Sequence, residues 1–334
     1  MKKLSILCAF AVAALVLFYA LPANSADYNE VTIKFALSGT EQAVDYFTAD
    51  YFKKKVEEES GGKVKVRIYP NNILAGGSMT EAANLLTMGG AYEMGIFSDT
   101  VLANLDPIML VDQLPFVFDN YTDANRYLDS TGTEWAKKIL SKYNLVVLGV
   151  EHNGLKQWTN NKSEKHTPAD FKNFKIRIPG GEVSTLTWKA LGADPVGMSW
   201  SETYTALQQG TVDGHENSYQ TIYSNNIHEI QKYITEAYYQ YASYWMVYNA
   251  KDFAKLNSDT QELLKKIGNE ASLWGRKYLE DIEGELKEKM IASGCVINVL
   301  TPEEKQSFID ATKGVIDHFR PIYGEEAYKA WGIE

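Results

Sequence analysis

The chain has 334 residues, of which 45% are hydrophobic and 23% charged. That composition supplies a large core and suits two domains better than one. The formal net charge is −10, and a surface of that sign repels nucleic acid and anionic lipid, so neither is expected as a partner.

The first 25 residues have the pattern of a secretory signal peptide. Lys2 and Lys3 precede an almost uninterrupted apolar run over 4–21, and small residues follow it. We expect cleavage after Ser25 or Ala26, although a retained N-terminal membrane anchor is the alternative. Cleavage would change the net charge from −10 to −12 and leave a single cysteine, so no intramolecular disulfide is expected. The mature protein is predicted to be soluble and exported.

The first part of the mature chain alternates strands and helices at short spacing. Residues 31–37 and 63–69 alternate apolar and polar side chains, as half-buried strands do, and 92–97 predicts a third strand. Helices are predicted between these strands, over 42–59 and 80–88. The order indicates an α/β domain built from βαβ units.

The middle of the chain continues this pattern. A helix is predicted over 122–143, and an apolar strand over 145–150 follows it. The polar, aromatic-flanked segment 152–161 is interpreted as a crossing between two domains. Short strands are predicted over 175–178 and 244–249.

A second helical signal follows the strand over 175–178. Ser199 and Glu202 fit a capping box, and Gly210 fits the glycine just past a helix end. This places Trp200 in the first helical turn, where unpaired backbone N–H groups gather. The polar segment 213–217 is predicted to be a loop.

The longest predicted helix runs over 259–293. At 1.5 Å per residue it would extend about 50 Å, which is longer than an ordinary domain is wide. Such a helix could brace two lobes, although a kink at Gly275 or Gly284 would shorten its reach. A last strand over 296–300 and a C-terminal helix capped by Thr301 complete the chain.

No pattern of residues predicts catalysis. The chain lacks a nucleophile elbow, a phosphate-binding loop and a zinc-protease motif, and its five histidines are not at metal-ligand spacing. His215 beside Glu216 is the only candidate acid–base pair, and adjacent loop residues usually point apart. We therefore predict no enzyme activity, no catalytic residue, no metal and no cofactor.

Arg177 is the first candidate for binding. It lies in the strand over 175–178, which leads directly into a Pro-Gly-Gly turn and a helix start, where ligands of α/β folds gather. Its guanidinium can hold a carboxylate by two parallel hydrogen bonds. A structural salt bridge is the alternative reading of Arg177. Likewise, Lys156 could be a solvated side chain, and Trp158 and Trp200 could belong to the core.

Several long runs resemble one known family. The runs are KIRIPG, KALGADPVGMSWSETYTALQQGTVDGHEN and IYSNNIHEIQKY, joined by the segments ILAGG, LPF and NGLKQWTNN. They resemble the solute-binding proteins of tripartite ATP-independent periplasmic (TRAP) transporters, of the DctP type. The resemblance implies a two-lobed α/β periplasmic-binding-protein fold with a hinge and a long helix spanning both lobes. We expect lobe I to comprise 26–153 and 243–282, and lobe II to comprise 154–242 and 283–334.

The resemblance also implies a set of binding residues. In the family, an arginine at the position of Arg177 grips the substrate carboxylate, and an asparagine at the position of Asn217 commonly assists. A second arginine usually stands where this chain has Lys156, which keeps the charge but loses the bidentate fork. Further candidates are aromatic faces and partners for hydroxyl groups, namely Trp158, Trp200, Phe97, Asn153 and Glu216.

The ligand is predicted to be a small organic carboxylate. A sugar acid such as a uronate or aldonate is favoured, while aromatic or keto acids and four-carbon dicarboxylates stay open. The resemblance implies TRAP membrane permease subunits as partners, and we expect a monomer. A ligand-sensing module is the alternative, because its binding domain would look the same in sequence.

Overall fold

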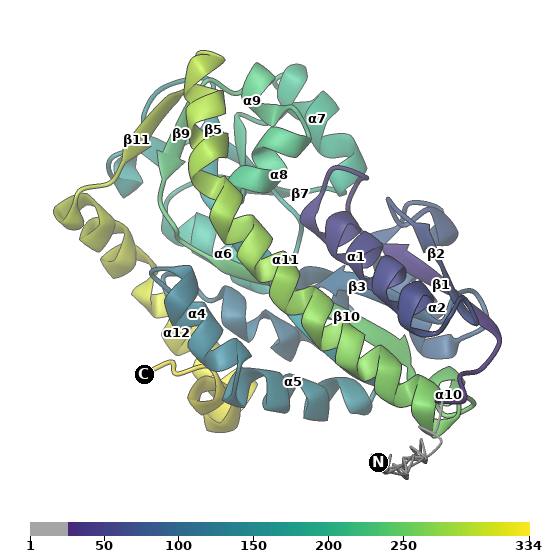
Figure 1. Cartoon of the computed structure of the whole chain (residues 1–334). Coiled ribbons are helices and arrows are strands. Elements are labelled where there is room, and N and C mark those ends of the chain that lie inside the picture. Colours follow the sequence, from purple (N-terminus) through teal and green to yellow (C-terminus); the bar gives the residue numbers. More distant parts are fainter. Residues whose placement is uncertain (1–25) are drawn as a thin grey trace, which may run out of the picture.

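The computed structural model describes residues 26–334, so the predicted signal peptide over 1–25 lies outside the described residues. Two β-sheets flanked by helices form two lobes, and a long helix runs diagonally across both (Figure 1). Among residues 26–334, no helix combines the length and apolar character needed to cross a membrane. The predicted two-lobed α/β fold is confirmed.

Lobe I is organised around a five-stranded sheet. In order across the sheet, the strands are β2 (Val64–Tyr69), β1 (Val31–Leu37), β3 (Met94–Ser98), β10 (Tyr241–Asn249) and β4 (Leu145–Leu155). β1 is parallel to β2 and β3, whereas β10 is antiparallel to both of its neighbours. Helices α1 (Val44–Glu59) and α2 (Met79–Met88) make the crossover connections, as expected of βαβ units.

The alternating sequence of β1 explains how this sheet is covered. Ile33, Phe35 and Leu37 are fully buried in one cluster with Phe52 of α1. Ala36 faces the other side and belongs to a second core with Trp245. Side chains of a strand alternate between the two faces of the sheet, so both sides of β1 are covered.

Lobe II contains a six-stranded sheet. In order, its strands are β11 (Val296–Val299), β9 (Tyr233–Glu236), β5 (Gln157–Asn160), β8 (Gly214–Asn217), β6 (Lys175–Ile178) and β7 (Asp194–Gly197). The prediction of a loop over 213–217 is wrong, because β8 pairs with β5 on one side and β6 on the other. Consequently His215 and Glu216 point to opposite faces of the sheet.

Shorter helices complete the two lobes. They are α3 (Asp99–Leu102), α4 (Tyr121–Leu128), α5 (Thr131–Ser141), α6 (Glu182–Ala190), α7 (Trp200–Gln208), α8 (Tyr219–Ser224), α9 (Ile227–Ile230), α10 (Ala250–Phe253) and the 3-10 turns Ile73–Ala75, Pro107–Gln113 and Pro168–Phe171. The single helix predicted over 122–143 is wrong. The chain forms α4 and α5 instead, because Ser130 between them has φ −145° and ψ −114°.

The long helix α11 (Ser258–Ala292) has 35 residues. It is capped by Asn257, whose side chain accepts a hydrogen bond from the Thr260 N–H (3.0 Å). It packs on α1 and β4 in lobe I and on α8 in lobe II. The prediction of a lobe-spanning helix is confirmed. Gly275 does not kink it; a Cβ there would lie 2.1 Å from the Glu151 carboxylate, so glycine permits close packing.

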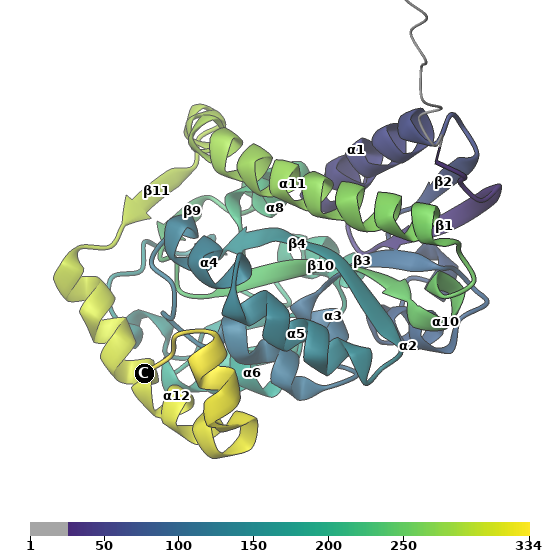
Figure 2. The same cartoon turned by 60° about the horizontal axis from the view of Figure 1, so that its bottom comes forward.

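The C-terminal helix α12 (Pro302–Ala330) also contacts both lobes (Figure 2). Phe308 packs in the lobe II core, while Phe319 and Tyr328 pack in the lobe I core. The sequence-based division placed all of 283–334 in lobe II. From Val315 onward α12 packs with lobe I, and the helix breaks at Gly324 (φ 80°) within that part.

Two short backbone crossings accompany α11 between the lobes. One joins β4 to β5 through Lys156, and the other joins β9 to β10 over 237–240. The crossings bond to each other, since the Lys156 N–H donates to the Gln240 carbonyl (2.9 Å) and the Tyr239 N–H donates to the Lys156 carbonyl (3.3 Å). Polar residues of both lobes therefore meet around Lys156.

Candidate ligand-binding site

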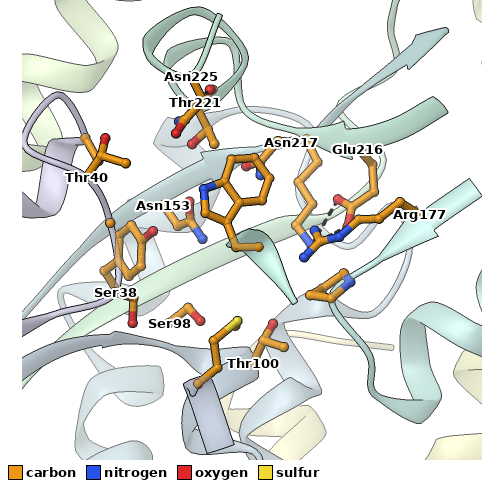
Figure 3. Close-up of a pocket in the computed structure, with 17 residues that line it drawn as sticks. Ser38, Thr40, Ser98, Thr100, Asn153, Arg177, Glu216, Asn217, Thr221 and Asn225 are labelled. Atoms are coloured by element: carbon orange, nitrogen blue, oxygen red, sulfur yellow. Dashed lines mark hydrogen bonds and ion pairs between the residues drawn. The ribbon is translucent and has the colours of Figure 1, made fainter. Parts of the chain in front are cut away.

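A pocket with about 660 Å³ of empty space, part of it open to solvent, lies between the lobes. Figure 3 shows side chains entering it from both sides, with Ser38 and Thr40 facing Arg177 and Glu216 across the space. Its lining residues are Ser38, Gly39, Thr40, Ala43, Met79, Ser98, Thr100, Asn153, Lys156, Arg177, Pro179, Trp200, Glu216, Asn217, Thr221, Asn225 and Tyr244.

The lobe I wall is built from the carboxyl ends of parallel strands. Ser38 and Thr40 follow β1, and Ser98 and Thr100 lie at the end of β3 and in α3. The Ser98 hydroxyl accepts a hydrogen bond from the Val101 N–H (3.2 Å), which begins α3. Ligands of α/β sheets gather at this edge, and the wall presents hydroxyl groups there.

Asn153 reaches the pocket because β4 is irregular at that residue. His152 pairs with Ser243 and Gly154 pairs with Ala242, which leaves Asn153 without a partner on β10. Such a bulge re-aims a side chain locally. The amide of Asn153 thus points into the space between the lobes (Figure 3).

Arg177 is the principal cation of the lobe II wall. Its side chain is only 2% exposed, and its Nη2 donates to the Met198 carbonyl (2.9 Å). The guanidinium carbon lies 5.3 Å from the ring centroid of Trp200, a cation–π contact. Burial lowers the pKa of Arg177 to about 10, with Glu216 and Glu202 opposing, so it stays charged at neutral pH. No ion pair among residues 26–334 involves Arg177.

Lys156 is the second cation, and it is already paired. Its Nζ lies 3.1 Å from Oε2 of Glu216 and donates to Oε1 of Gln113 (3.2 Å). Lys156 and Glu216 are 5% and 2% exposed, so the pair is shielded from water. Behind it, Gln113 donates to Asp99, whose pKa is raised to about 6 by burial, with Lys156 opposing. The charge of Lys156 is therefore compensated within the protein.

Trp200 is placed by the predicted capping box. The Glu202 carboxylate accepts hydrogen bonds from the Ser199 N–H (3.1 Å) and the Ser199 hydroxyl (2.5 Å), which fixes the first turn of α7. Trp200 is the first residue of that helix. Its ring therefore lies over Arg177 at a defined position.

Asn217 lies at the end of β8, directly before α8. Its side-chain oxygen accepts a hydrogen bond from the Ser218 N–H (3.0 Å), and Ser218 caps α8 by accepting from the Thr221 N–H (3.4 Å). Thr221 and Asn225 extend the polar wall along one side of α8.

The structure brings together six of the residues that were predicted to bind a ligand. They are Arg177, Asn217, Lys156, Trp200, Asn153 and Glu216. These residues come from β4, the β4–β5 crossing, β6, α7 and β8, so only the tertiary fold assembles them.

Trp158 and Phe97 do not line this pocket, which corrects their predicted placement. The ring of Trp158 packs edge-on against Phe171 and Phe308, with centroids 5.2 and 4.8 Å away, inside the lobe II core. Phe97 is fully buried in the lobe I core. It neighbours Ser98 on β3, and successive strand residues face opposite sides, so Ser98 meets the pocket instead.

Sequence reasoning missed the lobe I wall and the contribution of α8. The missed polar residues are Ser38, Thr40, Ser98, Thr100, Thr221, Asn225 and Tyr244. The sequence carried a signal for Ser38, Thr40, Ser98 and Thr100. Arg177 was chosen because polar residues at the carboxyl ends of parallel strands often bind ligands. The same rule applies to the ends of β1 and β3.

His215, the histidine of the predicted acid–base pair, is not among the residues that line the pocket. His215 is fully buried, and burial, Arg177 and Lys156 lower its pKa to about 3. Among residues 26–334, no cluster of three or more histidine, cysteine or acidic side chains could hold a metal ion. The pocket is suited to holding an anion between two lobes.

Two α/β lobes joined by crossing segments, with a polar, cationic pocket between them, define a two-lobed solute-binding protein. The model of the family described as bacterial extracellular solute-binding protein, family 7 (DctP), matches residues 35–321. The chain belongs to this family. The resemblance drawn from its sequence is thereby confirmed.

Curated relatives match over nearly the whole chain. One is the C4-dicarboxylate-binding periplasmic protein DctP of Vibrio cholerae, 29% identical over 92% of this chain and 92% of that protein. Another is the 2,3-diketo-L-gulonate-binding periplasmic protein YiaO of Escherichia coli, 26% identical over 93% and 92%. Their names include both a dicarboxylate and a sugar acid.

Solved structures agree with the fold. A TRAP periplasmic solute-binding protein from Shewanella oneidensis with bound succinate has a TM-score of 0.85 and 27% identity, covering 90% of this chain and 98% of that one. One from Haemophilus influenzae with bound L-gulonate has a TM-score of 0.83 and 27% identity, covering 90% and 97%.

Proposed function

We propose that this protein is the periplasmic solute-binding protein of a TRAP transporter. It binds a small organic acid, best a sugar acid such as an aldonate or uronate, in the pocket between its lobes. The lobes close on the acid, and the protein delivers it to the membrane permease. Membership of the DctP family and the cationic interlobe pocket support this proposal.

One observation carries the choice of a carboxylate ligand. Arg177 is the buried cation of the pocket that forms no ion pair with a carboxylate of residues 26–334, whereas Lys156 is paired with Glu216. A buried charge without a partner is unfavourable, and an incoming anion relieves this. The planar guanidinium matches a carboxylate by two parallel hydrogen bonds.

The rest of the pocket favours a ligand rich in hydroxyl groups. Most lining residues away from Arg177 are uncharged and polar, namely Ser38, Thr40, Ser98, Thr100, Asn153, Asn217, Thr221, Asn225 and Tyr244. Hydroxyls and amides on both walls can exchange hydrogen bonds with a polyol chain. Micromolar capture requires about −8 kcal/mol, which one sheltered carboxylate contact and several hydroxyl contacts can supply.

The bound acid is released unchanged, so the protein is not an enzyme in this proposal. His215 stays neutral, and Glu216 is engaged by Lys156. Prolonged incubation of the purified protein with its ligand is expected to return the ligand intact. Turnover would contradict the proposal.

Location and partners follow from the same proposal. The mature chain begins near residue 26 and acts in the periplasm as a monomer, with two TRAP permease subunits as its partners. Mass spectrometry of a periplasmic extract should show the cleaved N-terminus, and light scattering should give the mass of one chain. A protein retained with the membrane, or one that couples to a signalling receptor instead, would contradict this part.

A thermal-shift screen over organic acids tests the ligand class. A bound ligand raises the melting temperature by mass action. We expect aldonates or uronates to give the largest shifts, with calorimetry then giving one site per chain. Shifts restricted to neutral sugars, or to no acid at all, would contradict the proposal.

A four-carbon dicarboxylate is the second candidate, favoured by the presence of Lys156 as a second cation in the pocket. The relative from Vibrio cholerae is named for such ligands. The ion pair between Lys156 and Glu216 argues against it, because a second ligand carboxylate would have to compete with Glu216 (3.1 Å).

The variant Glu216→Gln separates the two candidates. Removing the charge of Glu216 frees Lys156, so calorimetry should show tighter binding of succinate, by roughly tenfold, with little gain for a sugar acid. Asp213→Asn is the control, since Asp213 pairs with the exposed Lys162 outside the pocket. If wild-type protein already binds succinate more tightly than any sugar acid, the sugar-acid proposal is wrong.

A further inference from the structure

A row of buried polar residues crosses the sheet of lobe II beside the pocket. Arg177 on β6 pairs with His215 on β8, and His215 pairs with Thr159 on β5. Residues in register on adjacent strands share one face of the sheet. Their exposed fractions are 2%, 0% and 1%, so the three side chains form one shielded line that ends at the ligand-binding cation.

The hydrogen bonds of this row favour one tautomer of His215. Thr159 Oγ1 lies 2.7 Å from His215 Nδ1 and 3.3 Å from Gln231 Oε1. Gln231 Nε2 donates to the Ile230 carbonyl (3.3 Å), so the amide is oriented with Oε1 toward Thr159. Because Oε1 only accepts, Thr159 gives its one proton to Gln231. Thr159 therefore accepts from His215, which places the imidazole proton on Nδ1.

The other ring nitrogen is then an acceptor next to a donor. His215 Nε2 and Arg177 Nε are both buried, and neither has a hydrogen-bond partner among residues 26–334. One has a lone pair and the other has an N–H, and they belong to residues in register on β6 and β8. Buried polar atoms are rarely left unmatched. The two atoms do not bond to each other in this structure, but they are complementary, since one is a donor and the other an acceptor.

Trp200 joins the same group. Its ring lies 5.3 Å from the guanidinium carbon of Arg177 and 6.0 Å from the ring of His215. Trp200 therefore covers both residues from the side of α7. Burial and the two nearby cations, Arg177 and Lys156, lower the pKa of His215 to about 3, which keeps the ring neutral and its lone pair available.

We propose that His215 is a positioning residue for the carboxylate-binding arginine. It is held as the neutral Nδ1–H tautomer by Thr159, and its Nε2 lone pair accepts from the Nε–H of Arg177 when the ligand is bound. In that arrangement Nη1 and the second N–H of Nη2 face the ligand, while Nη2 keeps its hydrogen bond to the Met198 carbonyl (2.9 Å). The inference rests on the proposed function of Arg177 as the carboxylate anchor.

Two substitutions of His215 separate this role from simple packing. A glutamine amide reaches the position of Nε2, whereas an asparagine amide reaches only the position of Nδ1. His215→Gln should keep the acid affinity within about threefold of wild type, and His215→Asn should weaken it roughly tenfold or more. Equal affinities for the two variants would overturn the proposal, whether both match wild type or both are weakened alike.

His228→Gln is the matched control. His228 stacks on Tyr223, with ring centroids 4.7 Å apart, and lines a different hollow of lobe II. Its replacement should leave the affinity for the acid unchanged. A loss equal to that of His215→Asn would show a general effect of removing a lobe II histidine and would overturn the proposal.

A measurement on ligand-free wild-type protein tests the proposal even if a variant fails to fold. Long-range ¹H–¹⁵N spectra at neutral pH should show His215 with a protonated Nδ1 and a bare Nε2. A proton on Nε2 would overturn the proposal. The result does not depend on which acid binds. If no acid binds at all, the proposed function is wrong. The tautomer measurement would still show whether Nε2 of His215 is free to accept a hydrogen bond from Arg177.

Discussion

Arg177 combines two properties that rarely occur together. Its side chain is almost completely buried, yet its charge has no carboxylate partner among residues 26–334. The Met198 carbonyl and the face of Trp200 are its main protein contacts. Both stabilise a cation without neutralising it, so the electrostatic attraction of Arg177 stays available for a ligand.

Replacing Arg177 by Met should abolish binding of the acid while the protein stays folded. Methionine fills similar space, and the loss of a sheltered bidentate contact should exceed a hundredfold in affinity. Arg177→Lys keeps the charge but loses the fork, so an intermediate loss is expected. Calorimetry measures both, with circular dichroism as the check on folding. Full affinity in the methionine variant would refute the role of Arg177.

For single residues, position within a strand predicted the pocket lining better than residue type did. Arg177 was found from its place at a strand end, and it lines the pocket. Trp158 and Phe97 were chosen because aromatic rings suit sugars, and both lie in cores. Which face of a strand an aromatic ring occupies depends on the partner strands and helices, and these are long-range contacts that no local pattern specifies.

Among the elements, α11 is the one whose packing is most specific. It crosses the sheet of lobe I so closely that Gly275 lies against Thr48 and Glu151, which hydrogen-bond to each other. A Cβ at Gly275 would lie 2.2 Å from Thr48 Oγ1. Both neighbours are buried, so neither can move aside into solvent.

Gly275→Ala should therefore destabilise the protein, even though alanine is the better helix former by about 1 kcal/mol. Overpacking of this kind is expected to lower the free energy of unfolding by about 1–3 kcal/mol. Gly284→Ala is the control in the same helix, because a Cβ there meets no atom within 4 Å. It should raise stability slightly. Chemical denaturation compares them, and equal effects would contradict the packing argument.

Element boundaries could be predicted where the chain carries local signals. The strands β1 and β6 and the helix α11 follow from alternation, periodicity and caps, and the structure has them within a residue of the expected ends. β8 could not be predicted, because four polar residues form a strand only when β5 and β6 supply partners on both sides.

At the scale of the whole molecule, ligand binding should change the shape of the protein. Contacts from both walls of the pocket favour a form in which the lobes are closer. Small-angle X-ray scattering should show a smaller radius of gyration in the presence of the acid. Arg177→Met should show no change at the same acid concentration. An unchanged radius with saturated wild-type protein would exclude closure.

The position of Lys156 on the crossing between β4 and β5 has a further consequence. Residues near an axis of rotation move least, so a solute that touches Lys156 and Arg177 meets the same groups whether the lobes are apart or together. A solute shifts a conformational equilibrium only through contacts that differ between the two forms. In the proposed binding mode those contacts come from the other wall of the pocket, which Ser38, Thr40 and Ser98 line. An acid too short to reach them would occupy the protein without closing it, and would act as an inhibitor of uptake rather than as cargo.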